Sequence, residues 1–205
     1  MEYFILALLW IVWCAIHSGM ISVTATKFFK RVLGGNYRFF RLSYNLIALG
    51  TFLYVIYYSH SLEGPELFRW SGPLIIIQSL AIGVVAYLCV AGMLIYDMWQ
   101  FLGVRQIKSG LTHSTLSESE DFITRGILGI TRHPWYLAAL IIIWTDYHIM
   151  HTYELLTNVM LTSYVIIGTL MEERKLILEY GNAYRAYQQK VSMLFPFKWL
   201  KTMLP

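Results

Sequence analysis

The charged residues of this chain are clustered, and they leave long uncharged segments between them. Four segments without Asp, Glu, Lys or Arg run for 24, 21, 27 and 17 residues, at positions 3–26, 42–62, 70–96 and 155–171. A helix needs about 20 apolar residues to cross the hydrocarbon core of a bilayer. Only 14% of the 205 residues are charged and 57% are hydrophobic, whereas soluble domains have about 25% charged residues. These features exclude an ordinary soluble globular domain.

The apolar segments predict helical membrane spans, because an isolated strand cannot satisfy its backbone hydrogen bonds in lipid. We expect five spans, at residues 3–25, 42–60, 73–97, 134–150 and 155–171. The fourth has the shortest uncharged core, since Asp146 interrupts it. No basic residue precedes the first span, the reverse of a cleavable signal peptide, so we expect this helix to be retained. The expected fold class is all-α: a polytopic transmembrane helical protein of about five spans, followed by cytosolic C-terminal helices.

The basic residues predict the orientation of these spans. Of the 16 Lys and Arg residues, 15 lie in the first loop, the third loop or the C-terminal tail, and only Arg69 lies in the opposite loops. By the positive-inside rule, we expect the N-terminus outside and the C-terminus in the cytosol. This topology signal accounts for the net charge of +4, so we expect no nucleic-acid binding. Cys14 and Cys89 lie within apolar segments, where we expect packing residues and neither a disulfide nor a metal site.

A cluster of polar residues opens the fourth predicted span. Pro134 suits the first turn of a helix, and His133 then lies at or near its N-cap. Arg132 and His133 would stand at the positive end of this helix, a place suited to an anionic group. Tyr136 follows His133 by three residues and shares its helix face.

Two neighbouring carboxylates follow the fifth predicted span. Because the fourth and fifth spans have similar lengths, we expect Glu172 and Glu173 to return to about the depth of His133. Two interpretations of this layer stay open. One is a boundary salt bridge between Arg132 and a glutamate. The other is a zwitterionic ligand, with its ammonium on a glutamate and its carboxylate on Arg132.

Two C-terminal segments resemble the signatures of a family of integral-membrane methyltransferases. They are residues 126–136 (GILGITRHPWY) and 172–196 (EERKLILEYGNAYRAYQQKVSMLFP). The family includes the isoprenylcysteine carboxyl methyltransferases and the phospholipid methyltransferases. The N-terminal half is more loosely similar to the NnrU-like and methanethiol S-methyltransferase branch, through His17-Ser18, Tyr37-Arg38, Tyr44-Asn45, and Asp97 with the following FLGVRQ (101–106).

The resemblance implies S-adenosylmethionine as the cofactor and no metal. It implies that Glu172 or Glu173 holds the amino group of the cofactor, and that Arg132 binds its carboxylate or orients the acceptor. The cofactor-binding residues that it implies are Gly126, His133, Pro134, Tyr136, Glu172 and Glu173, and the expected catalytic residues are Arg132, His17 and Glu173. Residues 1–131 are then an N-terminal region of three spans with a cytosolic loop, and residues 132–205 form the cofactor-binding catalytic region.

The expected reaction is methyl transfer to a small thiol or another membrane-partitioned acceptor, which would be a partner beside the cofactor and membrane lipids. Alternatives are O- or N-methylation of an isoprenylcysteine or a phospholipid headgroup, a nicotinamide-dependent membrane reductase, and a non-catalytic NnrU-like or nurim-like protein. His17 lies in the first span, where ionisable groups are functional candidates. With Asn45 and Asp97 it would line an acceptor pocket; an interhelical hydrogen bond is the other interpretation.

The C-terminal tail contains further structural signals. Gly181 predicts the end of the helix that follows the fifth span, and a second helix is expected over residues 182–191. Tyr180, Tyr184 and Tyr187 recur at helical spacing, which favours an aromatic belt at the membrane interface. In the third loop, Ser117 and Glu120 have the spacing of a capping box.

Overall fold

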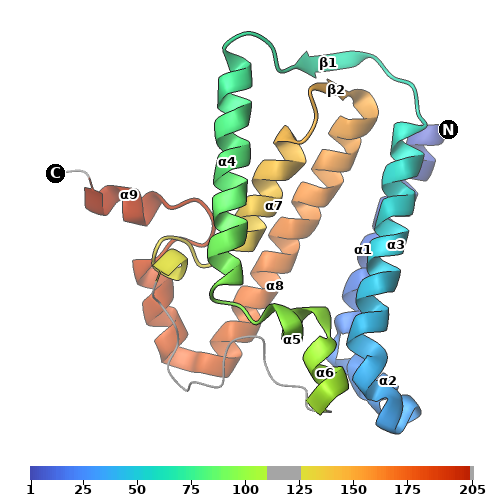
Figure 1. Cartoon of the computed structure of the whole chain (residues 1–205), viewed down its shortest axis with the longest axis vertical. Helices are drawn as coiled ribbons and strands as arrows, with labels where there is room; N and C mark the ends of the chain where they lie inside the picture. The colour runs from blue at the N-terminus through green and yellow to red at the C-terminus, as the bar shows by residue number, and fades with distance from the viewer. Residues whose placement is uncertain (110–125, 204–205) are drawn as a thin grey trace. The chain divides into compact units, whose positions relative to one another are not determined.

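The computed structural model describes residues 1–109 and 126–203, and this part of the chain is helical apart from one two-stranded sheet (Figure 1). Four helical segments are long and apolar enough to cross a membrane. They are α1 (Glu2–Ile21), the segment Val23–His60 that contains α3 (Phe40–His60), α4 (Leu74–Met93) and α8 (Thr152–Lys190). The prediction of an all-α, polytopic membrane fold is confirmed. The predicted capping box of the third loop lies outside the described residues.

The fourth predicted span is shorter than expected. The helix α7 (Pro134–Thr145) has 12 residues, which corresponds to about 18 Å of helix against about 30 Å of hydrocarbon. It ends at Asp146, and the chain then forms β2 (Ile149–His151), which pairs with β1 (Glu66–Arg69). The predicted helix over residues 134–150 was therefore too long, because the charge of Asp146 and the strand pairing end it early.

The chain divides into two compact units that are each discontinuous in sequence. The first comprises Met1–Leu67, the described part of Tyr96–Glu118, and His151–Met160. The second comprises Phe68–Ile95, the described part of Ser119–Met150, and the described residues of Leu161–Pro205. The division between residues 131 and 132 stays a prediction.

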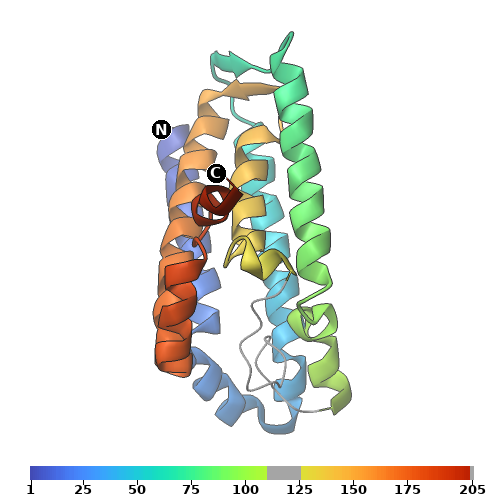
Figure 2. The same ribbon diagram turned by 90° about the vertical axis from the view of Figure 1, so that its left-hand side faces the viewer.

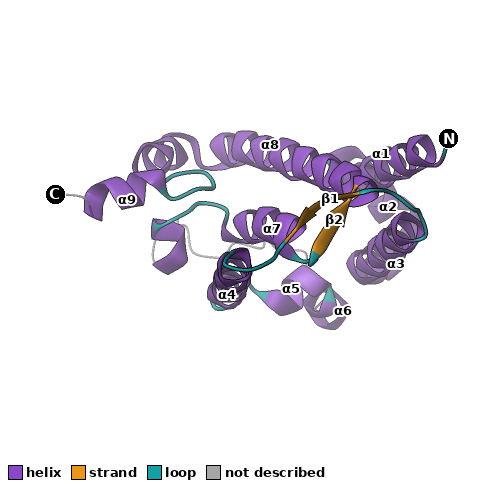
Figure 3. Cartoon of the chain, turned by 90° about the horizontal axis from the view of Figure 1, so that it is seen from above, coloured by secondary structure: helices purple, strands orange, loops and turns teal. Residues whose placement is uncertain are grey.

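In the first unit, α1 packs against α3 (Figure 3). Two tryptophans of α1 form hydrogen bonds to neighbouring helices. Trp10 is fully buried, and its indole N–H donates to Thr157 Oγ1 at 3.1 Å. Trp13 donates to the carbonyl of Ala48 at 3.1 Å. Many other large apolar side chains of α1 are exposed, among them Phe4 at 69%, as expected of a helix that faces lipid.

In the second unit, α7 packs along α4 (Figure 1). The amide of Gln78, on α4, donates to the carbonyls of Thr145 and Tyr147, both at 2.9 Å. These two bonds satisfy carbonyl groups at and beyond the end of α7, which lack an intrahelical partner. Leu137 and Leu140 of α7 are buried. Packing against neighbouring segments therefore stabilises α7, although the helix is too short to cross the bilayer.

The long helix α8 is interrupted at Gly181, whose φ is 56° and ψ −126°. The predicted helix end at this residue is confirmed, and the second helical stretch continues to Lys190. A positive φ favours glycine because a Cβ would clash with the backbone. The kink turns the chain so that Gln188, after it, lies 2.6 Å from Glu173, before it.

We expect Gly181→Ala to lower the free energy of unfolding by about 1–2 kcal/mol, the cost of a left-handed φ at an L-residue. Gly168→Ala is the matched control in the same helix, because an added Cβ there has no other atom within 4 Å. This control should be neutral or stabilising by up to about 1 kcal/mol. Thermal unfolding in detergent measures both, and equal losses would contradict the role given to the positive φ.

Candidate functional site

Glu173 is the centre of a buried hydrogen-bond network in the second unit. Its side chain is 7% exposed. The carboxylate accepts hydrogen bonds from Nε and Nη2 of Arg132 at 2.9 and 2.6 Å, and from Nε2 of His133 at 2.6 Å. It also accepts from the hydroxyl of Tyr184 at 2.5 Å and the amide of Gln188 at 2.6 Å. Arg132 and Glu173 thus form a bidentate ion pair, the strongest geometry for this pair of groups.

The segment before α7 is held in place by the segment after α8. The backbone N–H groups of Arg132 and His133 donate to the carbonyls of Ser192 and Met193 at 3.0 and 3.2 Å. Thr131 and Ser192 form a parallel β-bridge. Because this pairing fixes the backbone, it directs the side chains of Arg132 and His133 toward α8. The predictions that Pro134 occupies the first turn of α7 and that His133 is its N-cap are confirmed.

Arg132 has a second structural role at the end of α8. Its Nη1 donates to the carbonyl of Val191 at 2.5 Å, beside that of Gln188 at 3.4 Å. Lys198 Nζ donates to the carbonyls of Gln188 and Gln189 at 2.6 and 3.0 Å. These cations satisfy carbonyl groups that lack partners at the C-terminal end of a helix. The guanidinium of Arg132, 8% exposed, is therefore engaged on both sides.

The two neighbouring glutamates have different surroundings. An ionised carboxylate has about four lone-pair positions, and Glu173 already accepts five hydrogen bonds, so it has no capacity for a ligand. The side chain of Glu172 is 41% exposed, and its Oε2 lies 3.9 Å from Nδ1 of His133. Of the two interpretations of this layer, the salt bridge is present, between Arg132 and Glu173. A ligand ammonium would have to bind Glu172.

Glu173 and Tyr136 orient the ring of His133. Because an ionised carboxylate can only accept, the bond to Glu173 requires a proton on Nε2 of His133. In the neutral ring, Nδ1 then carries a lone pair directed toward Glu172. The ring of Tyr136 stacks on His133, with centroids 5.5 Å apart and planes inclined by 25°. In this neutral form, Nδ1 of His133 and Oε2 of Glu172 are two acceptors 3.9 Å apart, a separation that a single shared donor would bridge.

The interfacial belt predicted for the tail tyrosines is wrong for two of them. Tyr184 and Tyr187 are 1% and 5% exposed. Their hydroxyls donate to Glu173 and to the carbonyl of Leu128, the latter at 2.6 Å. Their helical spacing does place them on one face, but this face is directed inward. Sequence reasoning missed Tyr184 and Gln188 as supports of the site, because spacing shows which residues share a face and not where that face points.

Gly126 opens the short 3₁₀ helix η2 (Gly126–Gly129), which packs near α4 in the second unit. Its φ is +63°, and an added Cβ would meet only Ile95, at an ordinary contact distance of 3.8 Å. The backbone conformation therefore explains the glycine, and no close approach requires it.

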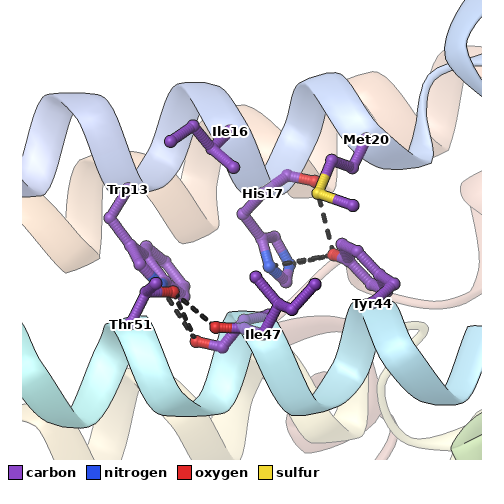
Figure 4. Close-up of a pocket in the computed structure, with 8 residues that line it drawn as sticks. Trp13, Ile16, His17, Met20, Tyr44, Ile47 and Thr51 are labelled. Atoms are coloured by element: carbon purple, nitrogen blue, oxygen red, sulfur yellow. Dashed lines mark hydrogen bonds between the residues drawn. The ribbon is translucent and has the colours of Figure 1, made fainter.

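In the first unit, His17 lies opposite Tyr44 (Figure 4). The hydroxyl of Tyr44 is 2.9 Å from both ring nitrogens of His17, and Trp13 stacks on the imidazole with centroids 4.9 Å apart. The expected interhelical hydrogen bond is thus present. The same side chains also line a small pocket between α1 and α3 with a cavity volume of about 10 Å³, formed by Trp13, Ile16, His17, Met20, Tyr44, Ile47, Ala48 and Thr51.

Asn45 and Asp97, which were expected beside His17, are engaged elsewhere in the first unit. The amide of Asn45 donates to the carbonyls of Phe101 and Leu102 at 3.1 and 3.2 Å. Asp97 caps α5 (Met98–Leu102) through the N–H of Gln100. Both residues satisfy the ends of a short helix, which otherwise has unpaired backbone groups.

The fold and this network define a polytopic helical membrane protein with a buried Arg–His–Glu cluster beside its last long helix. The family model described as "NnrU protein" matches residues 5–202. The chain belongs to the NnrU family, as the sequence motifs had indicated.

Curated relatives of this chain are named methanethiol S-methyltransferases. Methanethiol S-methyltransferase 1 of Bradyrhizobium diazoefficiens is 32% identical over 104 residues, which cover 51% of this chain and 36% of the relative. The enzyme of Pseudomonas sp. (strain GM41(2012)) is 33% identical over 98 residues, or 48% and 37% of the two chains. That of Crocosphaera subtropica is 28% identical over 126 residues, or 62% and 48%. The matched part thus spans between a third and a half of these relatives. No solved structure matches.

We expect Glu173→Gln to lower the free energy of unfolding by about 3–5 kcal/mol, because it leaves the buried guanidinium of Arg132 without its counter-charge. The isosteric control is Glu172→Gln, one residue earlier and partly exposed, which should change stability by no more than about 0.5 kcal/mol. Thermal unfolding of the purified variants in one detergent makes the comparison. If both variants unfold at the same temperature, the network does not stabilise the fold.

Proposed function

We propose that this chain is an integral-membrane methyltransferase that transfers the methyl group of S-adenosylmethionine to a small thiol. The names of the relatives support this reaction class. One observation carries the assignment of the site. The partly exposed carboxylate of Glu172 lies 3.9 Å from a His133 ring whose other nitrogen is fixed by Glu173.

The residues present fit the amino group of the cofactor. A primary ammonium has three donors, and it can donate to Oε2 of Glu172 and to Nδ1 of His133 at once. A hydrogen bond from a charged donor to a carboxylate is strong and directional. Arg132 is a poor partner for the cofactor carboxylate, because its donors are engaged by Glu173 and by backbone carbonyls. We therefore assign binding to Glu172 and His133, and positioning of His133 to Glu173 and Arg132.

The remaining residues of the motif act on the shape of the site. The ring of Tyr136 covers one face of His133 and limits its rotation. Pro134 fixes the backbone at the first turn of α7, because its φ is restrained by the ring. Gly126 permits the turn into η2. None of these three needs to take part in the chemistry itself.

When bound, S-adenosylmethionine would supply a methyl group on a positively charged sulfur, so that a thiolate forms a carbon–sulfur bond as the other breaks. The chain has to hold the donor in line with the acceptor, and alignment of this kind accounts for much of the acceleration in such reactions. The thiol must also lose its proton to a base. His17 keeps its place in the proposal as this base, since a neutral imidazole has one ring nitrogen that can accept a proton.

Two further features favour a small acceptor in the cytosolic leaflet. The pocket beside His17 has a cavity volume of about 10 Å³, far below the roughly 300–1,000 Å³ of the sites that proteins use for drug-sized ligands, so it has no room for a large acceptor. The distribution of basic residues favours a cytosolic location for the C-terminal region, where the cofactor is synthesised and available. We therefore propose that the C-terminus and the site of methyl transfer face the cytosol.

We expect Glu172→Gln and His133→Ala to weaken binding of S-adenosylmethionine by about tenfold to a hundredfold, the value of one charge-assisted hydrogen bond. Glu179→Gln, an exposed glutamate of the same helix, is the matched control and should bind as the wild type does. Titration calorimetry on the full chain in detergent measures the affinities. Equal affinities for Glu172→Gln and Glu179→Gln would refute the assignment.

The acceptor is tested with labelled S-adenosylmethionine and a panel of methanethiol, larger thiols, a prenylated cysteine analogue and phosphatidylethanolamine. We expect label in methanethiol, and a rate reduced at least tenfold in His17→Ala at neutral pH. If label appeared in the prenylcysteine carboxylate or in the lipid amine and in none of the thiols, the proposed thiol acceptor would be wrong. The proposed methyltransferase activity would still hold. Transfer to none of them would favour a non-catalytic membrane protein.

A further inference from the structure

The short helix α2 (Val23–Leu33) joins α1 to α3, the long apolar helix of the candidate membrane segment Val23–His60. The chain leaves α1 through the extended backbone of Ser22, whose side chain caps α2 by accepting from the N–H of Ala25 at 3.2 Å. It then passes through η1 (Gly34–Phe39) into α3. Figure 2 shows α2 running across the ends of α1 and α3. A helix that joins two spans on one side of a bilayer lies at its surface.

One face of α2 is apolar and is not covered by the described part of the chain. At 100° per residue, Phe28, Val32 and Leu33 fall on one side of the helix with Ala25 and Phe29. Phe28 is 58% and Val32 is 64% exposed, and α2 contains no buried residue. An exposed apolar face of this kind needs a partner outside the protein.

The opposite face of α2 is basic. Lys27, Lys30 and Arg31 lie three and four residues apart on this face and are all exposed. Residues 27–41 contain five Lys or Arg and no Asp or Glu. Among the ion pairs between described residues, none involves these three side chains. Their charges are therefore available to an anionic partner.

We propose that α2 lies in the headgroup layer and binds anionic phospholipids. In this arrangement Phe28 and Val32 insert at the boundary with the acyl chains, and Lys27, Lys30 and Arg31 contact lipid phosphates. Basic amphipathic helices bind membranes through this combination of apolar area and charge. The adjoining spans already bring α2 to the bilayer, so the lipid phosphates are the anions closest to it.

The negative charge of the bilayer surface determines how strongly α2 should prefer anionic lipid. Each Lys or Arg near an anionic surface improves binding by about fivefold. We expect the wild-type chain to prefer anionic over zwitterionic lipid at this helix. Neutralising all three cations should remove most of that preference. If their contributions are independent, the affinity of α2 for anionic lipid should fall by up to about a hundredfold.

The experiment uses the full chain in phosphatidylcholine nanodiscs that contain a trace of spin-labelled phosphatidylglycerol or spin-labelled phosphatidylcholine. The immobilised fraction of each label gives the lipid preference. The test variant is Lys27→Gln/Lys30→Gln/Arg31→Gln, and the control, Arg174→Gln/Lys175→Gln/Arg185→Gln, removes the same charge from exposed positions of α8. We expect the test variant to lose the preference and the control to keep most of it. No preference in the wild type, or equal losses in both variants, would overturn the proposal.

A second measurement locates the helix. Phe28→Cys and Lys30→Cys, each carrying a nitroxide on a background without Cys14 and Cys89, place labels on the apolar and the basic face, about 160° apart around the helix. In nanodiscs with phosphatidylglycerol, the label at position 28 should collide more with oxygen, which concentrates in the bilayer, and the label at 30 more with a water-soluble nickel complex. A label at 28 that is exposed to water in every lipid would overturn the proposal and point to a soluble protein partner.

Discussion

The second unit depends on how the buried charge of Glu173 is neutralised. An ionised carboxylate away from water is costly unless it is paired and hydrogen-bonded. Glu173 meets this requirement with the fork of Arg132 and the ring of His133, which precede α7, and with Tyr184 and Gln188, which follow the kink of α8. The donors come from segments up to 56 residues apart in sequence, so the network forms only when α7, the kink and the C-terminal segment are all in place.

This neutralisation explains how two neighbouring glutamates come to differ. Consecutive residues of a helix point about 100° apart, so Glu173 faces inward and Glu172 is partly exposed. The inner carboxylate requires a proton on Nε2 of His133, and the outer one lies 3.9 Å from Nδ1 of the same ring. In the proposed reaction, one glutamate therefore acts through the histidine, and the other contacts the cofactor.

The ends of helices impose a second constraint on polar side chains. In a protein with long apolar helices, a carbonyl that lacks an intrahelical partner has little water to bind. Gln78 satisfies carbonyls at the end of α7, Asn45 those of α5, and Arg132 and Lys198 those of α8. Several residues that look functional in an apolar sequence are accordingly used for this purpose. Asn45, expected at an acceptor pocket, is one example.

The sequence by itself determined the features that depend on local composition and backbone chemistry. The spacing of charged residues predicted the long helices. Pro134 predicted the first turn of α7, and Gly181 predicted the break in α8. Tertiary structure decided which glutamate is buried, that Tyr184 points inward, and that α7 ends at Thr145. Periodicity defines the face of a helix but not its partner. The direction of each polar face follows from contacts between segments far apart in the chain, and those contacts exist only in the folded protein.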